Sequence, residues 1–299
     1  MELTLTNGDL SMKIKNIAIL SCCLLPFNAV ADDSIGELRA NFRRVALEMS
    51  STEVQNAKYY TDNPNSQLSA DSQNMIKGVF DFVLEYEQPT WQWNNSLFAE
   101  YGRTKIRPAD DETTTSEDAD QILFTTDYNR KMWHWDFDNV DAGPFASLAY
   151  QTEFKANNPA PLQKIFRGKA GIKAFNGDII KDLYVAAVGE YDLTYSDEHT
   201  TKSAYEIGWR TEYVNSDQVK FQFEGYFRDY LTYSEYIATD LKYELSAIGR
   251  MDVKIKNNFS LAPYVQYFQG EARGVGKTGS NFMIGLSFAY SELFNIYKK

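Results

Sequence analysis

Residues 219–231 read VKFQFEGYFRDYL, in which Val, Phe and Leu recur at odd positions and Lys, Gln, Glu and Arg at even positions. Because successive side chains of a β-strand point to opposite faces, this pattern predicts a strand with one apolar and one polar face. About twelve such segments follow one another after residue 36. The sequence therefore predicts an all-β protein.

The gaps between these segments alternate between short and long. Short gaps containing turn-forming residues lie at 88–90, 176–178, 215–217 and 257–258. Longer and more polar gaps lie at about 50–72, 106–119, 155–161, 196–202, 233–237 and 270–279. Barrels of the bacterial outer membrane have short periplasmic turns and longer external loops. We therefore predict a closed antiparallel transmembrane β-barrel of about 12 strands, with short periplasmic turns and longer external loops.

A periplasmic β-sandwich would show the same two-residue period, so the period alone does not decide the fold class. A Greek-key sandwich has no reason to keep the short–long order through consecutive hairpins. The apolar lines are also close to the ~9–11 residues that a tilted strand needs to cross a bilayer. Charged residues such as Glu206 and Arg210 lie in mid-strand, where an aqueous lumen would accept them. Aromatic residues form 15% of the chain, as expected for a wall with aromatic girdles.

The N-terminus predicts export. Positive residues precede an apolar stretch that ends at Ala29-Val30-Ala31, with small residues at the positions that a signal peptidase reads. We predict a signal peptide over 1–31, with Met12 as the natural initiator, and one barrel domain over 32–299. A buried N-terminal helix is the alternative.

The two cysteines, Cys22 and Cys23, lie inside this predicted signal peptide. A mature chain beginning at Asp32 therefore has no cysteine for disulfides, thiol catalysis or metal binding. The formal net charge is −11, and the absence of a basic patch argues against nucleic acid as a partner. An acidic run on a predicted external loop fits a solvated loop, or alternatively a site for divalent cations; it comprises Asp110, Asp111, Glu112, Glu117, Asp118 and Asp120.

Two segments are ambiguous. In 37–49, the apolar residues also fit a helical stripe, with charged residues on the other side. We favour a strand, because an even strand number places both chain ends on the periplasmic side; a helix here could plug the lumen or lie on the membrane. In 132–153, residues 141–144 (DAGP) interrupt the alternation, and we predict a bulge or a short extra turn there, since proline cannot donate to a central ladder.

The last predicted strand alternates from Phe282 onward and reaches an aromatic residue at Phe294. It is similar to the C-terminal strand that outer-membrane proteins present to the barrel assembly machinery. It departs from the usual pattern because residues 295–299 follow the phenylalanine. We expect the barrel assembly machinery and outer-membrane lipid to be the partners of this chain; the sequence does not indicate an oligomeric state.

Several phrases resemble a family of uncharacterised Gram-negative outer-membrane proteins that carry a domain of unknown function. They are KGVFDF at 77–82, WNNSL at 93–97, YGRTK at 101–105 and GYFRDY at 225–230. The resemblance covers about 36–294 and implies an outer-membrane barrel. It implies no catalytic or binding residues.

Catalytic and metal motifs are weak. His134 and His199 lack the clustered companions that a zinc site needs. Outer-membrane phospholipases use a serine–histidine pair, and no serine follows His134 closely; a dyad of His134 with Asp127 or Asp136 stays open. A phosphate-binding loop is not predicted either, because its first glycine is replaced by Glu271. We expect no enzyme activity, no cofactor and no metal.

If the polar faces point inward, they bring acidic and basic side chains into an enclosed lumen in nearly equal numbers. The lumen-facing charged candidates are Arg39, Arg43, Lys77, Asp81, Glu85, Glu100, Arg167, Lys169, Lys173, Glu206, Arg210, Glu224, Arg228, Lys242 and Glu244. Such a wall fits a small porin-like channel for hydrophilic solutes with modest ion selectivity. The alternatives are a closed structural or surface-receptor barrel whose charges pair across the interior, and a barrel enzyme that modifies lipids.

Overall fold

The computed structural model describes residues 36–60, 66–69, 72–106, 114–156, 161–196, 199–235 and 240–298. The predicted signal peptide, with Met12, Cys22 and Cys23, lies outside these residues. Residues Gly36–Lys299 form one compact unit. In the part of the chain so described, no helix is long and apolar enough to cross a membrane.

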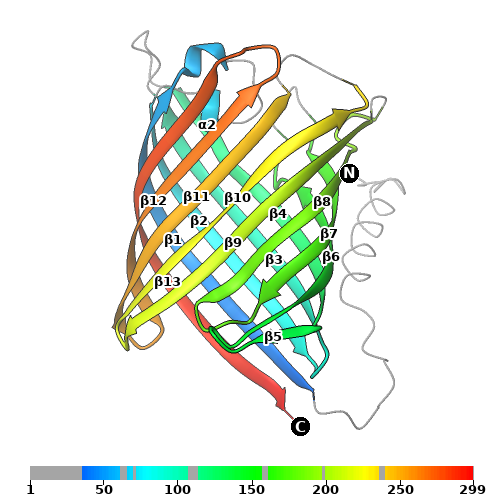
Figure 1. Cartoon of the computed structure of the whole chain (residues 1–299). Coiled ribbons are helices and arrows are strands. Elements are labelled where there is room, and N and C mark those ends of the chain that lie inside the picture. The colour runs from blue at the N-terminus through cyan, green and yellow to red at the C-terminus, as the bar shows by residue number, and fades with distance from the viewer. Residues whose placement is uncertain are drawn as a thin grey trace, which may run out of the picture. The chain divides into compact units, whose positions relative to one another are not determined.

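The unit is built from strands that tilt around a common axis (Figure 1). The strands are β1 (Glu37–Gln55), β2 (Ser72–Glu87), β3 (Trp91–Ile106), β4 (Thr114–Arg130), β5 (Trp133–Trp135), β6 (Val140–Thr152), β7 (Lys164–Phe175), β8 (Ile180–Asp192), β9 (Thr200–Ser216), β10 (Val219–Tyr233), β11 (Leu241–Lys256), β12 (Phe259–Ala272) and β13 (Thr278–Lys298). All pairings are antiparallel, β13 pairs with β1, and β4 pairs with β6 to close the ring. Since β5 only extends the ring beside β6, the barrel has twelve long strands, and the predicted fold is confirmed.

Short turns lie at one end of the barrel, together with the start of β1 and the end of β13 (Figure 1). We call this the turn end, and the opposite end the loop end. Three of the turns contain asparagine in the left-handed region: Asn139 (φ 49°), Asn176 (φ 62°) and Asn257 (φ 52°). Asparagine tolerates this conformation better than most residues, which is why the chain can reverse tightly at these positions. The alternation of short and long connections is as predicted.

The two faces of the barrel wall have opposite chemistry. Apolar side chains on the outside are widely exposed, for example Leu148 (66%), Ile284 (58%) and Val185 (57%). Charged side chains on the inside are covered, and Glu206 has no exposed surface at all. A water-soluble domain has the reverse distribution. This inside-out arrangement is that of a transmembrane barrel.

Segment 37–49 is a strand, so the favoured prediction is confirmed. A β-bulge falls between Phe42 and Val45, where the register to both neighbouring strands shifts. The bulge brings Arg43 and Arg44 to the same inward face, while Val45 (39% exposed) and Leu47 (55%) point outward. A bulge adds one residue to a strand and so reverses the inward–outward parity after it. This reversal produces the spacing that imitates a helix.

The prediction for 132–153 is correct in kind and wrong in place. The extra turn lies at residues 136–139, between β5 and β6, whereas residues 141–144 belong to β6. On one side of β6, the neighbouring strand changes from β5 to β4 at Pro144. Ala142 pairs with Trp133 of β5, and Phe145 pairs with Asn129 of β4. The ladder is already interrupted at that point, so proline is accommodated there.

At the loop end, the connection between β1 and β2 contains a short 3-10 helix, η1 (Ala57–Tyr59), and a single helical turn, α2 (Ser66–Ser69). Tyr60 and Leu68 are buried against Phe268 of β12. The Tyr60 hydroxyl lies 3.2 Å from the Gly270 carbonyl oxygen and 3.1 Å from the Gly279 amide nitrogen. This connection therefore covers part of the mouth at the loop end.

Candidate functional site

The interior holds a polar cavity of about 1330 Å³, lined by residues from all twelve long strands. Its lining extends from Glu87 and Lys220, beside the short turns, to Asp120 and Glu153, beside the long loops. The predicted charged candidates that line it are Arg39, Arg43, Lys77, Asp81, Glu85, Glu100, Arg167, Lys169, Glu206, Arg210, Glu224, Arg228 and Glu244.

Two predicted candidates do not line the cavity. Lys173 is buried in the wall, with Nζ 4.6 Å from the centre of the Phe145 ring and 3.7 Å from Asp182. Lys242 has 57% of its side chain exposed and lies 4.0 Å from Glu271. Arg44 and Glu48 also line the cavity, although the sequence analysis does not predict them there. Both follow the bulge in β1, which reverses the inward–outward order of the strand and is not visible in the sequence pattern.

One side of the lumen carries a tightly paired set of side chains from β7–β11, which we call the paired network: Lys169, Tyr184, Glu206, Arg228 and Glu244. Glu206 accepts hydrogen bonds from Lys169 and Tyr184. Arg228 donates from Nε to Glu206 over 2.6 Å and from Nη1 to Glu244 over 2.8 Å. Buried ions are stable only when their partners and hydrogen bonds are complete, as they are here.

Other charges pair both across the lumen and between neighbouring strands. Arg44 of β1 donates to Asp252 of β11 over 2.8 Å and to Ser287 of β13 over 3.1 Å. Lys77 lies 2.7 Å from Glu100 and 3.8 Å from Glu48. These contacts narrow the lumen and hold its wall in register.

Arg43 and Asp81 differ from the charges around them. Within the described residues neither makes an ion pair or a side-chain hydrogen bond, and the buried Arg43 Nε has no partner. The charge of Arg43 interacts with that of Arg210 on β9, although β13, β12, β11 and β10 separate β1 from β9 in the sheet order. The charge of Asp81 interacts first with that of Arg43 and then with that of Glu224 on β10. Arg43 and Asp81 are therefore two opposite charges on the lumen wall that interact with each other but form no ion pair or side-chain hydrogen bond among the described residues.

At the turn end, Glu87 connects three segments. It accepts hydrogen bonds from Arg39 (2.7 Å), Lys131 (2.5 Å) and Asn176 (3.3 Å). Lys131 also lies 3.2 Å from Asp141. These bonds tie β1, the β4–β5 connection and the β7–β8 turn together around the mouth.

His134 lies on β5, half exposed at the turn end. Its Nδ1 is 3.0 Å from Asp141, and its Nε2 is 3.7 Å from Asp136. In the region that the structure describes, no hydrogen bond joins His134 to a serine or threonine, and no group of three or more ligands could hold a metal ion. His199 contacts the Tyr191 hydroxyl at 3.0 Å.

The acidic run at 110–120 lies largely outside the described side chains. Asp120 is described, and it accepts hydrogen bonds from the backbone amides of Phe154 (2.6 Å) and Lys155 (3.0 Å). It therefore ties β4 to the connection after β6.

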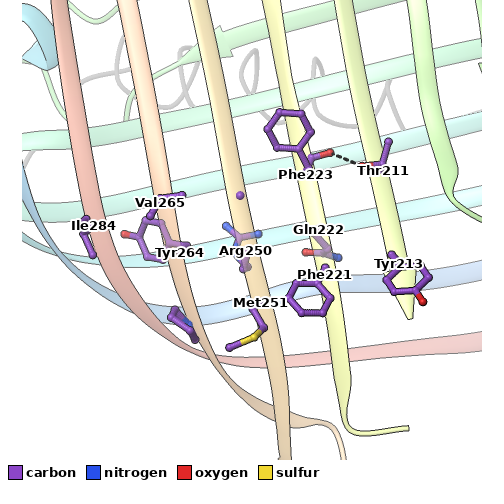
Figure 2. Close-up of a pocket in the computed structure, with 12 residues that line it drawn as sticks. Thr211, Tyr213, Phe221, Gln222, Phe223, Arg250, Met251, Tyr264, Val265 and Ile284 are labelled. Carbon is purple, nitrogen blue, oxygen red and sulfur yellow. Dashed lines mark hydrogen bonds between the residues drawn. The ribbon is translucent and has the colours of Figure 1, made fainter. Parts of the chain in front are cut away.

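The outer wall has a shallow apolar groove, of about 480 Å³, across β9–β13 (Figure 2). Phe221, Phe223, Met251 and Val265 surround Gly249, which leaves space because it has no side chain. The Thr211 hydroxyl donates to the Phe223 carbonyl at its edge, over 3.2 Å. The groove lies in the apolar face of the wall and holds no chemistry of its own.

A closed twelve-strand barrel with an apolar outside and a charged inside defines the class of this protein as a transmembrane β-barrel of the bacterial outer-membrane type. Residues 66–157 match a family described as a protein of unknown function (DUF3078). The phrases at 77–82, 93–97 and 101–105 lie within this match, whereas 225–230 lies outside it. The expected resemblance to a family of unknown function is thus confirmed over these residues.

Solved structures with similar folds are bacterial outer-membrane barrels. An outer membrane channel from Pseudomonas putida F1 is 9% identical, with a TM-score of 0.44, over 90% of this chain and 99% of that one. The outer membrane channel DcaP of Acinetobacter baumannii is 8% identical, with a TM-score of 0.41, over 86% and 97%. Outer membrane phospholipase A from Escherichia coli is 10% identical, with a TM-score of 0.37, over 82% and 89%. No curated protein matches the sequence.

Proposed function

We propose that this protein spans the bacterial outer membrane and forms a narrow, porin-like channel for small hydrophilic solutes. The observation that carries the proposal is the polar cavity, whose lining continues from the residues beside the short turns to those beside the long loops. Charged walls of mixed sign stabilise hydrated solutes and give modest ion selectivity.

The β5 extension supports a position at the membrane surface. Trp133 and Trp135 pair with Ala142 and Val140, so they share the outward face of the wall with Leu148. They are 47% and 45% exposed, and Phe137 stacks on Trp135 with ring centres 6.3 Å apart. Tryptophan prefers the interface between lipid and water. We infer that this aromatic face rests in the periplasmic leaflet, with outer-membrane lipid as its partner.

Fluorescence in vesicles tests this position. Lipids brominated near the headgroup should quench the tryptophan emission, and the quenched fraction should fall when Trp133 and Trp135 are both replaced by Phe. Replacing the more deeply placed Trp209 by Phe serves as the matched control and should change headgroup quenching less. Equal effects of the two replacements would contradict the assignment.

Single-channel recording tests the channel itself. The purified protein in planar bilayers should give stepwise conductance, and silence at all voltages and salt concentrations would reject the proposal. Tyr226 lines the lumen, whereas Phe223 on the same strand is 49% exposed on the outer wall. Tyr226→Ala should raise the unit conductance, and Phe223→Ala should leave it unchanged.

A closed barrel that acts as a surface receptor is the second candidate. The observation in its favour is the β1–β2 connection, which Tyr60 and Leu68 hold against the inside of the loop-end mouth. In that case deletion of residues 106–119 should abolish binding of a surface partner while the barrel still assembles. The channel proposal expects the deletion variant to keep conducting.

We infer no enzymatic role. The His134 contacts with Asp141 and Asp136 form an exposed cluster of polar side chains outside the lumen. His134→Ala should therefore not alter lipid hydrolysis measured with the reconstituted protein. We also propose that β13, which continues past Phe294 to Lys298, is the strand that the barrel assembly machinery recognises.

A further inference from the structure

We propose that Arg43 and Asp81 form a selectivity site for small zwitterionic solutes, those carrying one anionic and one cationic group, such as free amino acids. This inference rests on the proposed channel function and names the class of solute that the channel prefers. Among the described residues, Arg43 and Asp81 are opposite charges on the lumen wall that form no ion pair and no side-chain hydrogen bond.

The charges around this pair are matched. Arg44 pairs with Asp252, and Arg210 donates to Asp182 over 2.9 Å from Nε and 2.6 Å from Nη2. Arg250 lies 3.8 Å from Glu48 and 3.9 Å from Glu224. Within the described residues Arg43 and Asp81 form no such close pair, so both charges remain available to a solute in the lumen.

The bulge in β1 explains why the pair stays apart. In the register between β1 and β2, Asp81 stands opposite Arg44, and Arg43 is the extra residue. Arg43 therefore enters the lumen beside Asp81 without the cross-strand alignment that would pair their side chains. Its buried Nε, which has no acceptor, would gain a hydrogen bond from a carboxylate in the lumen.

Charge balance selects the solute. A simple anion is attracted by Arg43 and repelled by Asp81, and a simple cation experiences the reverse, so for either one the two Coulomb terms oppose each other. A zwitterion can place its carboxylate near Arg43 and its ammonium near Asp81, so that both terms are favourable. Carboxylates are also the groups that guanidinium binds best.

Liposome swelling compares solutes of nearly equal size. Zwitterionic alanine should enter vesicles containing the protein faster than neutral lactamide. Arg43→Gln and Asp81→Asn should each remove this preference, lowering the ratio of the two rates by about tenfold, the lower end of the range for one charge-assisted hydrogen bond. Asp217→Asn and Lys256→Gln, which remove one negative and one positive charge in or beside exposed short turns, should keep it.

Reversal potentials in a salt gradient give the second measurement. The Arg43→Gln channel keeps the negative charge of Asp81 and should become more selective for cations. The Asp81→Asn channel keeps the positive charge of Arg43 and should become more selective for anions. A purely structural role would not shift the two variants in opposite directions. Equal entry of alanine and lactamide, or shifts of the same sign, would overturn the inference and leave the channel in place. Exclusion of both solutes would overturn the channel proposal together with the site.

Discussion

The paired network and the Arg43–Asp81 pair lie in the same lumen and use the same residue types, yet they differ in completeness. Glu206 is fully buried and has three side-chain donors, whereas Asp81 has no ion-pair partner within the described residues. Paired charges rigidify a wall, because separating them leaves ions in a medium of low dielectric constant. Unpaired charges that face a polar cavity keep their capacity to bind. Under the proposed function, the paired network stabilises the barrel and the Arg43–Asp81 pair contacts the solute.

The largest effect is expected at Glu206. Glu206→Gln removes the charge that neutralises Lys169 and Arg228 while keeping the size of the side chain, and it leaves two buried cations short of an anion. Breaking a buried pair in this way costs about 3–5 kcal/mol. The free energy of unfolding in detergent micelles, measured by urea titration, should fall by that amount. A loss below about 1 kcal/mol, the level of an exposed pair, would show that water reaches this network.

An intermediate effect is expected at Glu87 in the turn-end mouth. Its carboxylate accepts bonds from Arg39, Lys131 and Asn176, but about a fifth of its side chain is exposed (21%). Glu87→Gln should therefore lower the free energy of unfolding by about 1–3 kcal/mol, the range for hydrogen bonds to charged groups. Glu292, which also lines the cavity near this end, gives a control. If Glu292→Gln lowers the free energy of unfolding as much as Glu87→Gln does, the hydrogen bonds of Glu87 have no special role in stabilising the turn-end mouth.

The barrel is predictable from the sequence because lipid outside and charge inside impose a two-residue period on every strand. Segments such as 219–231 carry this period through most of their length, so the inward and outward faces of the strand can be predicted. The period fails where the backbone departs from it. The bulge at Arg43 reverses the parity of β1, so Arg44 and Glu48 reach the lumen although the pattern gave no sign of it.

The completeness of the charge pairing lies beyond sequence reasoning for a different reason. Periodicity gives the face of each strand but not its height relative to strands across the lumen, because the stagger between strands accumulates around the ring. The contact between Arg44 of β1 and Asp252 of β11 depends on that stagger. Lys173 is a second example. It lies on the predicted inward face of β7, but its side chain is buried against Phe145 and does not reach the cavity.

The smallest effect on the free energy of unfolding is expected at Asp81. Measuring it is the most direct test of the difference between the paired network and the Arg43–Asp81 pair. Because Asp81 makes no ion pair or side-chain hydrogen bond within the described residues, Asp81→Asn should change the free energy of unfolding by no more than about 0.5 kcal/mol, as for substitutions away from paired or packed features. Asp81 and Glu206 are both carboxylates on the lumen wall, so the two amide substitutions differ only in what surrounds them. Urea titrations of the two variants side by side should therefore differ by several kcal/mol, while selectivity should change mainly in Asp81→Asn. If Asp81→Asn destabilises the barrel as much as Glu206→Gln does, Asp81 is part of the structural pairing and cannot serve as a free anion for a solute.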